Sequence, residues 1–275
     1  MKEFIKFLIS ANYKGALTLL YKRPRYFFLL FKIRIIEKYF KIDTFFLSPR
    51  FLIIYFFEEI NLQKKYKYPL EACGNYFIDF KKIKNTFPIL YSGGVGENIS
   101  FDIEFLNKTK GLARLFDPTP QSIEYMRSKE ANNLKFYPYA LYKESKKVKI
   151  YFDKFKQVKS NSISNFLDFD QADFYMCDAY NIPDLMKKFN DNKIDILKLD
   201  VEGVSIGIVE NCFKNNIYPN QIIIAIEVPM NYLSFFKFYR KLKIFINNLS
   251  ENYELVNLRD RSRGVEMEIL CLKKN

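Results

Sequence analysis

Two acidic residues stand close together at the end of an apolar segment, in Lys198-Leu-Asp-Val-Glu-Gly203. If that segment is a strand, alternation places Lys198, Asp200 and Glu202 on one side of it. Open α/β sheets gather their reactive groups at the carboxyl edge of the strands. Two carboxylates this close could make one a general base by raising its pKa, or could hold a divalent cation. The alternative is that Lys198 neutralises them and Gly203 only serves a turn.

A second feature is a glycine turn that contains Gly93, Gly94 and Gly96 and follows the apolar residues 88–91. Glycines allow a ligand to approach the backbone closely, and a helix that begins after them offers free N–H groups. A strand, a glycine turn and a helix start in this order predict a nucleotide pocket in an α/β domain.

The pattern after the turn predicts a helix from Glu97 onward, with Ile99, Ile103 and Leu106 on one buried face. A dinucleotide fingerprint needs a third glycine where this chain has Ile99. A bulky residue there argues against a pyrophosphate. It is compatible with S-adenosylmethionine (SAM), which has no phosphate.

The residue two positions before Gly94 is Ser92, where a typical methyltransferase turn has an acidic residue near the amino group of the ligand. Ser92 could still form a hydrogen bond there. Glu97 or Asp102 could instead supply the negative charge.

Asp117 ends a second apolar segment, 23 residues beyond Gly94. An acidic residue at that strand end is placed to hold a ribose diol through two charge-assisted hydrogen bonds. The alternative is a simple turn, because Asp117-Pro-Thr-Pro also suits a helix cap.

The chain contains no histidine, and its four cysteines form no CxxC pair. Histidine-dependent nucleophiles and histidine metal sites are therefore excluded. A general base must be an Asp, Glu, Lys, Tyr or Cys side chain, and a metal would need mainly oxygen ligands. Scattered cysteines suit a reducing cytoplasm.

From residue 71 onward, patterns of strand and helix alternate, which predicts a mostly parallel sheet with right-handed crossovers. A final antiparallel hairpin is usual in SAM-dependent methyltransferases. The expected strands are 88–91, 112–116, 136–141, 172–177, 194–201, 221–228, 253–258 and 265–272, with an inserted hairpin arm around 148–155, and the later helices are 182–189, 204–213 and 231–249.

Residues 1–70 form a separate basic and aromatic region that we expect to be helical. They contain 14 Lys and Arg against 5 Asp and Glu, which is +9 of the net charge of +13. This region could touch an anionic membrane or a polymeric substrate. The alternative is a helical subdomain that packs on the main domain, 71–275. No apolar run reaches the length of a transmembrane helix, and no signal peptide is evident.

The chain resembles the FkbM family of SAM-dependent methyltransferases. The resemblance rests on the segments 91–102, 116–120, 140–141 and 196–203, of which Lys-x-Asp-Val-Glu-Gly is the most specific. It implies a class I, Rossmann-like fold with a seven-stranded, mostly parallel sheet and SAM as methyl donor. By motif, Gly94, Gly96, Asp117 and Leu141 would contact SAM, and Asp200 would lie beside the transferred methyl group.

The resemblance also implies O-methylation, often on sugars of bacterial glycans or on natural products. The motif of many amino-group methylating enzymes, Asp/Asn-Pro-Pro-aromatic, is absent. We therefore expect a sugar O-methyltransferase with Asp200 or Glu202 as base, directly or through a water or a divalent cation. Glu227, which ends a later apolar segment, is a further candidate. The alternatives are an RNA methyltransferase and a non-catalytic or NAD-type sugar-modifying protein. DNA is not an expected partner.

Overall fold

The computed structural model describes residues 69–129, 132–153, 162–163, 172–227, 232–258 and 266–274. The predicted helical extension, residues 1–70, lies outside this part of the chain apart from its last two positions. The predicted domain boundary near residue 70 therefore stays a prediction.

The described residues form a central sheet of seven strands with the order β11-β12-β10-β9-β3-β4-β5. Five neighbouring strands, from β10 to β5, run parallel, and the C-terminal hairpin β11–β12 adds two antiparallel strands beside β10. This is the predicted class I arrangement. The strands are β3 (Ile89–Gly93), β4 (Leu112–Phe116), β5 (Leu134–Tyr137), β9 (Ile196–Leu199), β10 (Gln221–Glu227), β11 (Tyr253–Asn257) and β12 (Glu266–Lys273).

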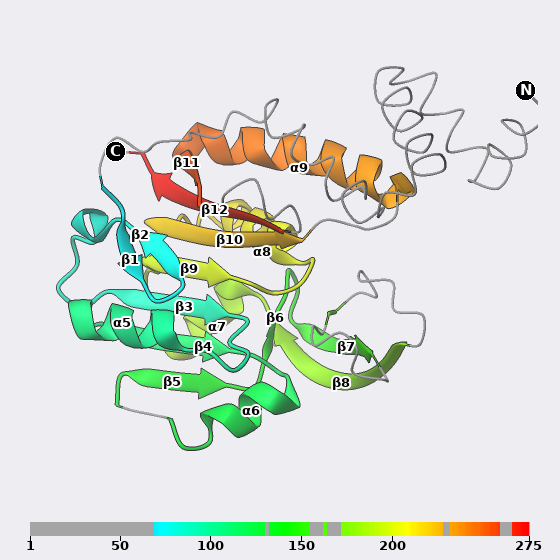
Figure 1. Cartoon of the computed structure of the whole chain (residues 1–275), viewed down its shortest axis with the longest axis horizontal. Helices are drawn as coiled ribbons and strands as arrows, with labels where there is room; N and C mark the ends of the chain where they lie inside the picture. Colours follow the sequence, from blue (N-terminus) through cyan, green and yellow to red (C-terminus); the bar gives the residue numbers. More distant parts are fainter. Residues whose placement is uncertain are drawn as a thin grey trace, which may run out of the picture.

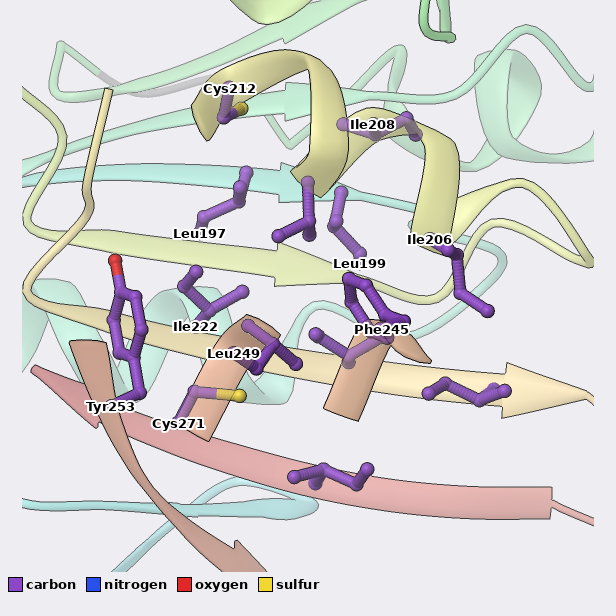
Figure 2. Close-up of a cluster of buried hydrophobic side chains, with 14 of the residues drawn as sticks. Leu197, Leu199, Ile206, Ile208, Cys212, Ile222, Phe245, Leu249, Tyr253 and Cys271 are labelled. Carbon is purple, nitrogen blue, oxygen red and sulfur yellow. The ribbon is translucent and has the colours of Figure 1, made fainter. Parts of the chain in front are cut away.

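Helices lie on both faces of the sheet (Figure 1), and buried apolar side chains fill the layers between them and the sheet. On one face, side chains of α7 (Ile182–Phe189), α8 (Ser205–Lys214) and α9 (Tyr232–Asn252) pack on the sheet. Figure 2 shows those of α8 and α9 around Leu197 and Ile222. The other face is covered by α5 (Ser100–Thr109), α6 (Pro120–Met126) and a small hairpin, β1 (Glu71–Cys73) and β2 (Tyr76–Ile78), which a 3₁₀ turn, η2 (Phe80–Lys82), follows. Burial on both faces explains why the central strands are nearly continuous apolar runs.

A second sheet of three strands is inserted between β5 and α7, where we expected a hairpin arm. Its order is β6-β8-β7, with β6 (Ala140–Leu141), β7 (Lys146–Asp153) and β8 (Ala172–Tyr180). Figure 1 shows this inserted sheet beyond the carboxyl ends of the parallel strands. The insertion therefore adds residues to the edge at which open α/β sheets bind ligands.

Helix α5 differs from the prediction in its start and in one residue of the predicted buried face. It begins at Ser100 rather than at Glu97, and the Asn98 side chain accepts a hydrogen bond from the Ser100 N–H. Ile99, which precedes the helix, and Leu106 are buried as predicted. Ile103 is 40% exposed, and Phe101 and Phe105 lie inside instead.

Two predicted strands are also corrected. The segment 136–141 is split between β5 and β6, because Pro138 cannot donate to a strand ladder. Strand β9 is shorter than 194–201 at both ends. At its start, the Asp195 carboxylate accepts hydrogen bonds from Asn85, from Asn220 and from the backbone N–H of Ile89.

Candidate active site

The two glycines of the turn that were predicted to contact a cofactor have different surroundings. Gly94 has φ +75°, and a Cβ added there would lie 1.7 Å from the carbonyl oxygen of Asp200. Gly96 has φ +55°, and a Cβ there would meet no atom within 4 Å. Position 94 therefore requires a glycine, because the backbone after β9 leaves no room for a side chain. Gly96 borders open space that a ligand can use.

Asp117 ties the glycine turn to the start of α6. Its Oδ2 accepts hydrogen bonds from the N–H groups of Val95 (2.9 Å) and Gly96 (3.0 Å). Its Oδ1 accepts from the N–H (2.9 Å) and the hydroxyl (2.6 Å) of Thr119. The carboxylate therefore has the structural role considered as the alternative. The predicted contact with ribose stays a prediction, and a ribose diol would share these oxygens with the protein.

Beneath the turn lies a buried polar layer made of Ser92, Asp102 and Lys198. The Lys198 ammonium donates to the carbonyl oxygens of Gly94 (2.9 Å) and Gly93 (3.5 Å). Burial raises the pKa of Asp102, and the charge of Lys198 and the Ser92 hydroxyl oppose that rise. Lys198 thus supports the glycine turn. This role differs from the alternative role, in which Lys198 neutralises Asp200 and Glu202.

Three further residues proposed for cofactor contact have contrasting positions. Ser92 is fully buried on the α5 side of β3, and Glu97 is exposed in the turn before α5. Leu141 is also buried, and a Cβ added to Gly93 would lie 2.6 Å from its Cδ1. Leu141 therefore packs against the end of β3. The contacts of these three side chains with a cofactor stay predictions.

Asp200 is the first residue after β9 and is half-buried. Its N–H donates to the Gly93 carbonyl oxygen (3.1 Å), which fixes its backbone beside the glycine turn. The hydroxyl of Tyr76 donates to Asp200 Oδ2 (2.8 Å). Sequence reasoning missed Tyr76, because nothing in the local pattern of β2 indicates a partner so far along the chain.

The turn after Asp200 has an unusual backbone. Glu202 has φ +41° and Gly203 has φ +84°, so two consecutive residues are left-handed. For a glutamate this conformation costs free energy and must be held by its surroundings. The peptide between the two residues is held at both ends. Ser162 Oγ donates to the Glu202 carbonyl oxygen (2.8 Å), and the Gly203 N–H donates to Glu227 Oε2 (2.6 Å). Because the chain turns here, strand alternation does not extend from Asp200 to Glu202.

Glu227 ends β10 and is 4% exposed. Its Oε1 has no hydrogen-bond partner among the described residues. Burial is the main cause that raises the pKa of Glu227 to about 8, the charges of Glu202 and Asp200 add to the rise, and the Gly203 N–H opposes it. The structure thus places three carboxyl groups at the ends of neighbouring strands β9 and β10.

Among the residues that the structure describes, no group of three or more Cys, Asp or Glu side chains is arranged to hold a metal ion. The three carboxyl groups give the suggested divalent cation no support. In the same part of the chain, no helix combines the length and the apolar character needed to cross a membrane.

Comparisons with known proteins identify the family. The model described as the methyltransferase FkbM domain matches residues 94–256. The chain belongs to the FkbM methyltransferase family. The matched segment starts at Gly94 and includes Asp117, Asp200, Glu202 and Glu227, so it contains most of the site described above. No curated protein matches this FkbM methyltransferase by sequence.

Several solved structures have a similar chain path, and some of them are named as methyltransferases. They include the fibrillarin/Nop5p complex, with TM-score 0.42, 10% identity and coverage of 69% of this chain and 74% of that chain. The Methanococcus jannaschii fibrillarin pre-rRNA processing protein has TM-score 0.39, 13% identity and coverage of 75% and 71%. The plantazolicin methyltransferase BpumL with SAH has TM-score 0.37, 10% identity and coverage of 100% and 99%. At 10–13% identity, these similarities carry no conclusion about the methyl acceptor.

The chain is a SAM-dependent methyltransferase of this family. The site fits this cofactor in three respects. Open space lies at Gly96, Asp117 stands at the end of β4 beside it, and carboxyl groups at the ends of β9 and β10 suit a positively charged sulfonium.

Proposed function

We propose that this methyltransferase transfers a methyl group to a hydroxyl of a sugar, in the biosynthesis of a bacterial surface glycan or a related compound. The reaction would take place in the cytoplasm. Residues 1–70 would bring the enzyme to the inner face of the membrane, because their charge of +9 and their aromatic content suit an anionic lipid surface.

The observation that carries this proposal is the set of carboxyl groups around Asp200, next to the glycine turn. A hydroxyl is a weak nucleophile until a base takes its proton. The chain has no histidine for this task. Carboxyl groups at the cofactor edge therefore support a hydroxyl acceptor, and the family resemblance supports a sugar as its source.

Bound SAM supplies an electrophilic methyl group on a positively charged sulfur. The protein mainly has to position the acceptor oxygen in line with that methyl and receive the proton. Asp200 or Glu202 would contact the acceptor hydroxyl as the base, and Tyr76 would orient Asp200 through its hydrogen bond. The glycine turn, Asp117, Ser92, Glu97 and Leu141 would hold the cofactor.

The test is incubation of the full-length protein with methyl-labelled SAM and a panel of nucleotide sugars and glycan extracts, analysed by mass spectrometry. The expected product is a sugar that gains one methyl group on oxygen. Asp200→Asn is expected to retain SAM binding and to lose most of the transfer. Full turnover by this variant would contradict the role of Asp200, and methylation on nitrogen would contradict the proposed acceptor.

RNA is the second candidate acceptor, because a basic region adjoins the methyltransferase domain. RNA binding would weaken steeply with salt and would disappear when residues 1–70 are deleted. Methylated RNA together with no methylated sugar would replace the sugar proposal.

A further inference from the structure

The Glu227 carboxyl is buried at the cofactor edge with half of its hydrogen-bonding capacity unused. Its Oε2 accepts from the Gly203 N–H at 2.6 Å, and its Oε1 has no partner in the described part of the chain. A buried carboxyl oxygen without a partner is costly. A glutamine could accept the same hydrogen bond without an ionisable group, so the acidic side chain at this position calls for a functional explanation.

The groups around Glu227 are mainly acidic. Asp200 and Glu202 follow β9, and both raise the pKa of Glu227. On the other side, β12 pairs with β10, and its buried Glu268 stands opposite Ala225. The nearest lysine on β9 is Lys198, whose ammonium donates to the glycine-turn carbonyl oxygens. Near neutral pH, mutual repulsion and burial therefore keep a proton on this cluster.

The cluster also adjoins the cofactor turn. The Asp200 N–H donates to the Gly93 carbonyl oxygen, and Gly94 lies directly against the Asp200 backbone. A positive charge bound at the turn would therefore favour ionised carboxyl groups in the cluster. SAM carries such a charge on its sulfur, whereas SAH has a neutral sulfur.

We propose that Glu227 stores the proton of the reaction: it loses a proton when SAM binds, and it receives the acceptor's proton, through Glu202, when the methyl group is transferred. The acceptor oxygen forms its bond to the methyl carbon, and the electron pair of the broken carbon–sulfur bond stays on sulfur. The acceptor O–H bond breaks, and its proton ends on Glu227. The positive charge leaves the sulfur at the same moment, so the proton affinity of Glu227 rises when the proton must be received.

This inference rests on the proposed hydroxyl acceptor only for its last step. Proton release on SAM binding can be measured without any acceptor. If no sugar of the panel is methylated, proton release on SAM binding can still be observed. If no proton is released, a sugar can still be methylated, so the two failures are distinguishable.

The experiment is isothermal titration calorimetry of the full-length protein with SAM and with SAH at pH 7.0–7.5, in buffers of low and high ionisation enthalpy. We expect release of up to about one proton per SAM, because a group with a pKa of about 8 is mostly protonated at this pH. We expect little release with SAH. Glu227→Gln should abolish the release with SAM, and the matched control Glu210→Gln, on α8, should keep it.

Equal proton release with SAM and SAH, or release that persists in Glu227→Gln, would overturn the proposal. A second measurement needs no variant. In the unmodified protein, SAM affinity should rise with pH up to about 8 and then level off, about tenfold per pH unit at most, while SAH affinity changes little. Parallel pH dependences for the two ligands would also overturn it. With an acceptor in hand, Glu227→Gln should lose the pH dependence of turnover while it retains SAM binding.

Discussion

The hydroxyl of Tyr76 donates a hydrogen bond of 2.8 Å to Oδ2 of Asp200, although the two residues are 124 positions apart. The hairpin β1–β2 thereby reaches the carboxyl edge of β9. The Tyr76 ring also lies 5.4 Å from the Phe101 ring and 5.2 Å from the Lys198 ammonium, which fixes the position of the hydroxyl.

Tyr76→Phe is predicted to reduce turnover by about tenfold and to leave SAM affinity nearly unchanged. The variant retains the ring contacts and loses only the hydrogen bond that orients Asp200, at a cost to stability of about 1 kcal/mol. Steady-state kinetics and SAM titration test this. Tyr253→Phe is the matched control, since it removes a buried hydrogen bond to the Pro219 carbonyl oxygen far from the site. Similar turnover losses in both variants would argue against a specific role for Tyr76.

Gly94→Ala and Gly96→Ala are predicted to have different effects. The Cβ at position 94 would collide with the Asp200 carbonyl oxygen at 1.7 Å, so we expect a loss of stability of more than about 3 kcal/mol or no folded protein. At position 96 the strain of a left-handed alanine costs only about 1 kcal/mol. This second variant should fold, and its SAM affinity should fall by about tenfold or more, because its methyl group occupies the open space. Chemical denaturation measures the stability of each variant, and SAM titration measures its affinity for the cofactor. Equal stabilities of the two variants would contradict the different roles given to Gly94 and Gly96.

Asp117→Asn is predicted to destabilise the protein by roughly 2–4 kcal/mol even without a ligand. One oxygen of the carboxylate becomes an amide donor, which then faces either two N–H groups or the N–H and hydroxyl of Thr119. Urea denaturation measures this effect, with the exposed Asp178→Asn on β8 as control, expected within about 0.5 kcal/mol of the unmodified protein. A decrease in SAM affinity beyond the loss of stability would support the ribose contact.

The stability of the protein is predicted to fall between about pH 5 and pH 8 because of Glu227. Its pKa is raised from 4.5 to about 8 in the folded protein. The folded state therefore holds a proton that the unfolded state has released. The stabilisation is fully present below pH 4.5 and is lost as the pH rises through 8, a change of roughly 3–5 kcal/mol. Thermal unfolding at a series of pH values tests this. A curve for Glu227→Gln with the same slope would show that other groups cause the dependence.

Local patterns were sufficient for most of the fold. Strands β4 and β10 and helix α7 lie where periodicity and composition predicted them, and the segment Asp117-Pro-Thr-Pro contains the N-cap of α6, Thr119. These features depend on residues within a few positions of each other, so the order of strands and helices can be derived from the chain alone. The start of α5 could not be derived in this way, because Asn98 accepts the Ser100 N–H in a turn and the helix begins only at Ser100.

The sequence by itself determined the family, the glycine turn and the carboxyl-bearing strand ends, since each of these is a short contiguous motif. Only the tertiary structure decided which groups meet there. It brought the Tyr76 hydroxyl to Asp200 and the Lys198 ammonium to the carbonyl oxygens of the glycine turn. It also brought Ser162 and Glu227 to the carbonyl oxygen and the N–H of the peptide between Glu202 and Gly203. Burial and mutual repulsion depend on neighbours that are distant along the chain, and the pKa of Glu227 is raised through them.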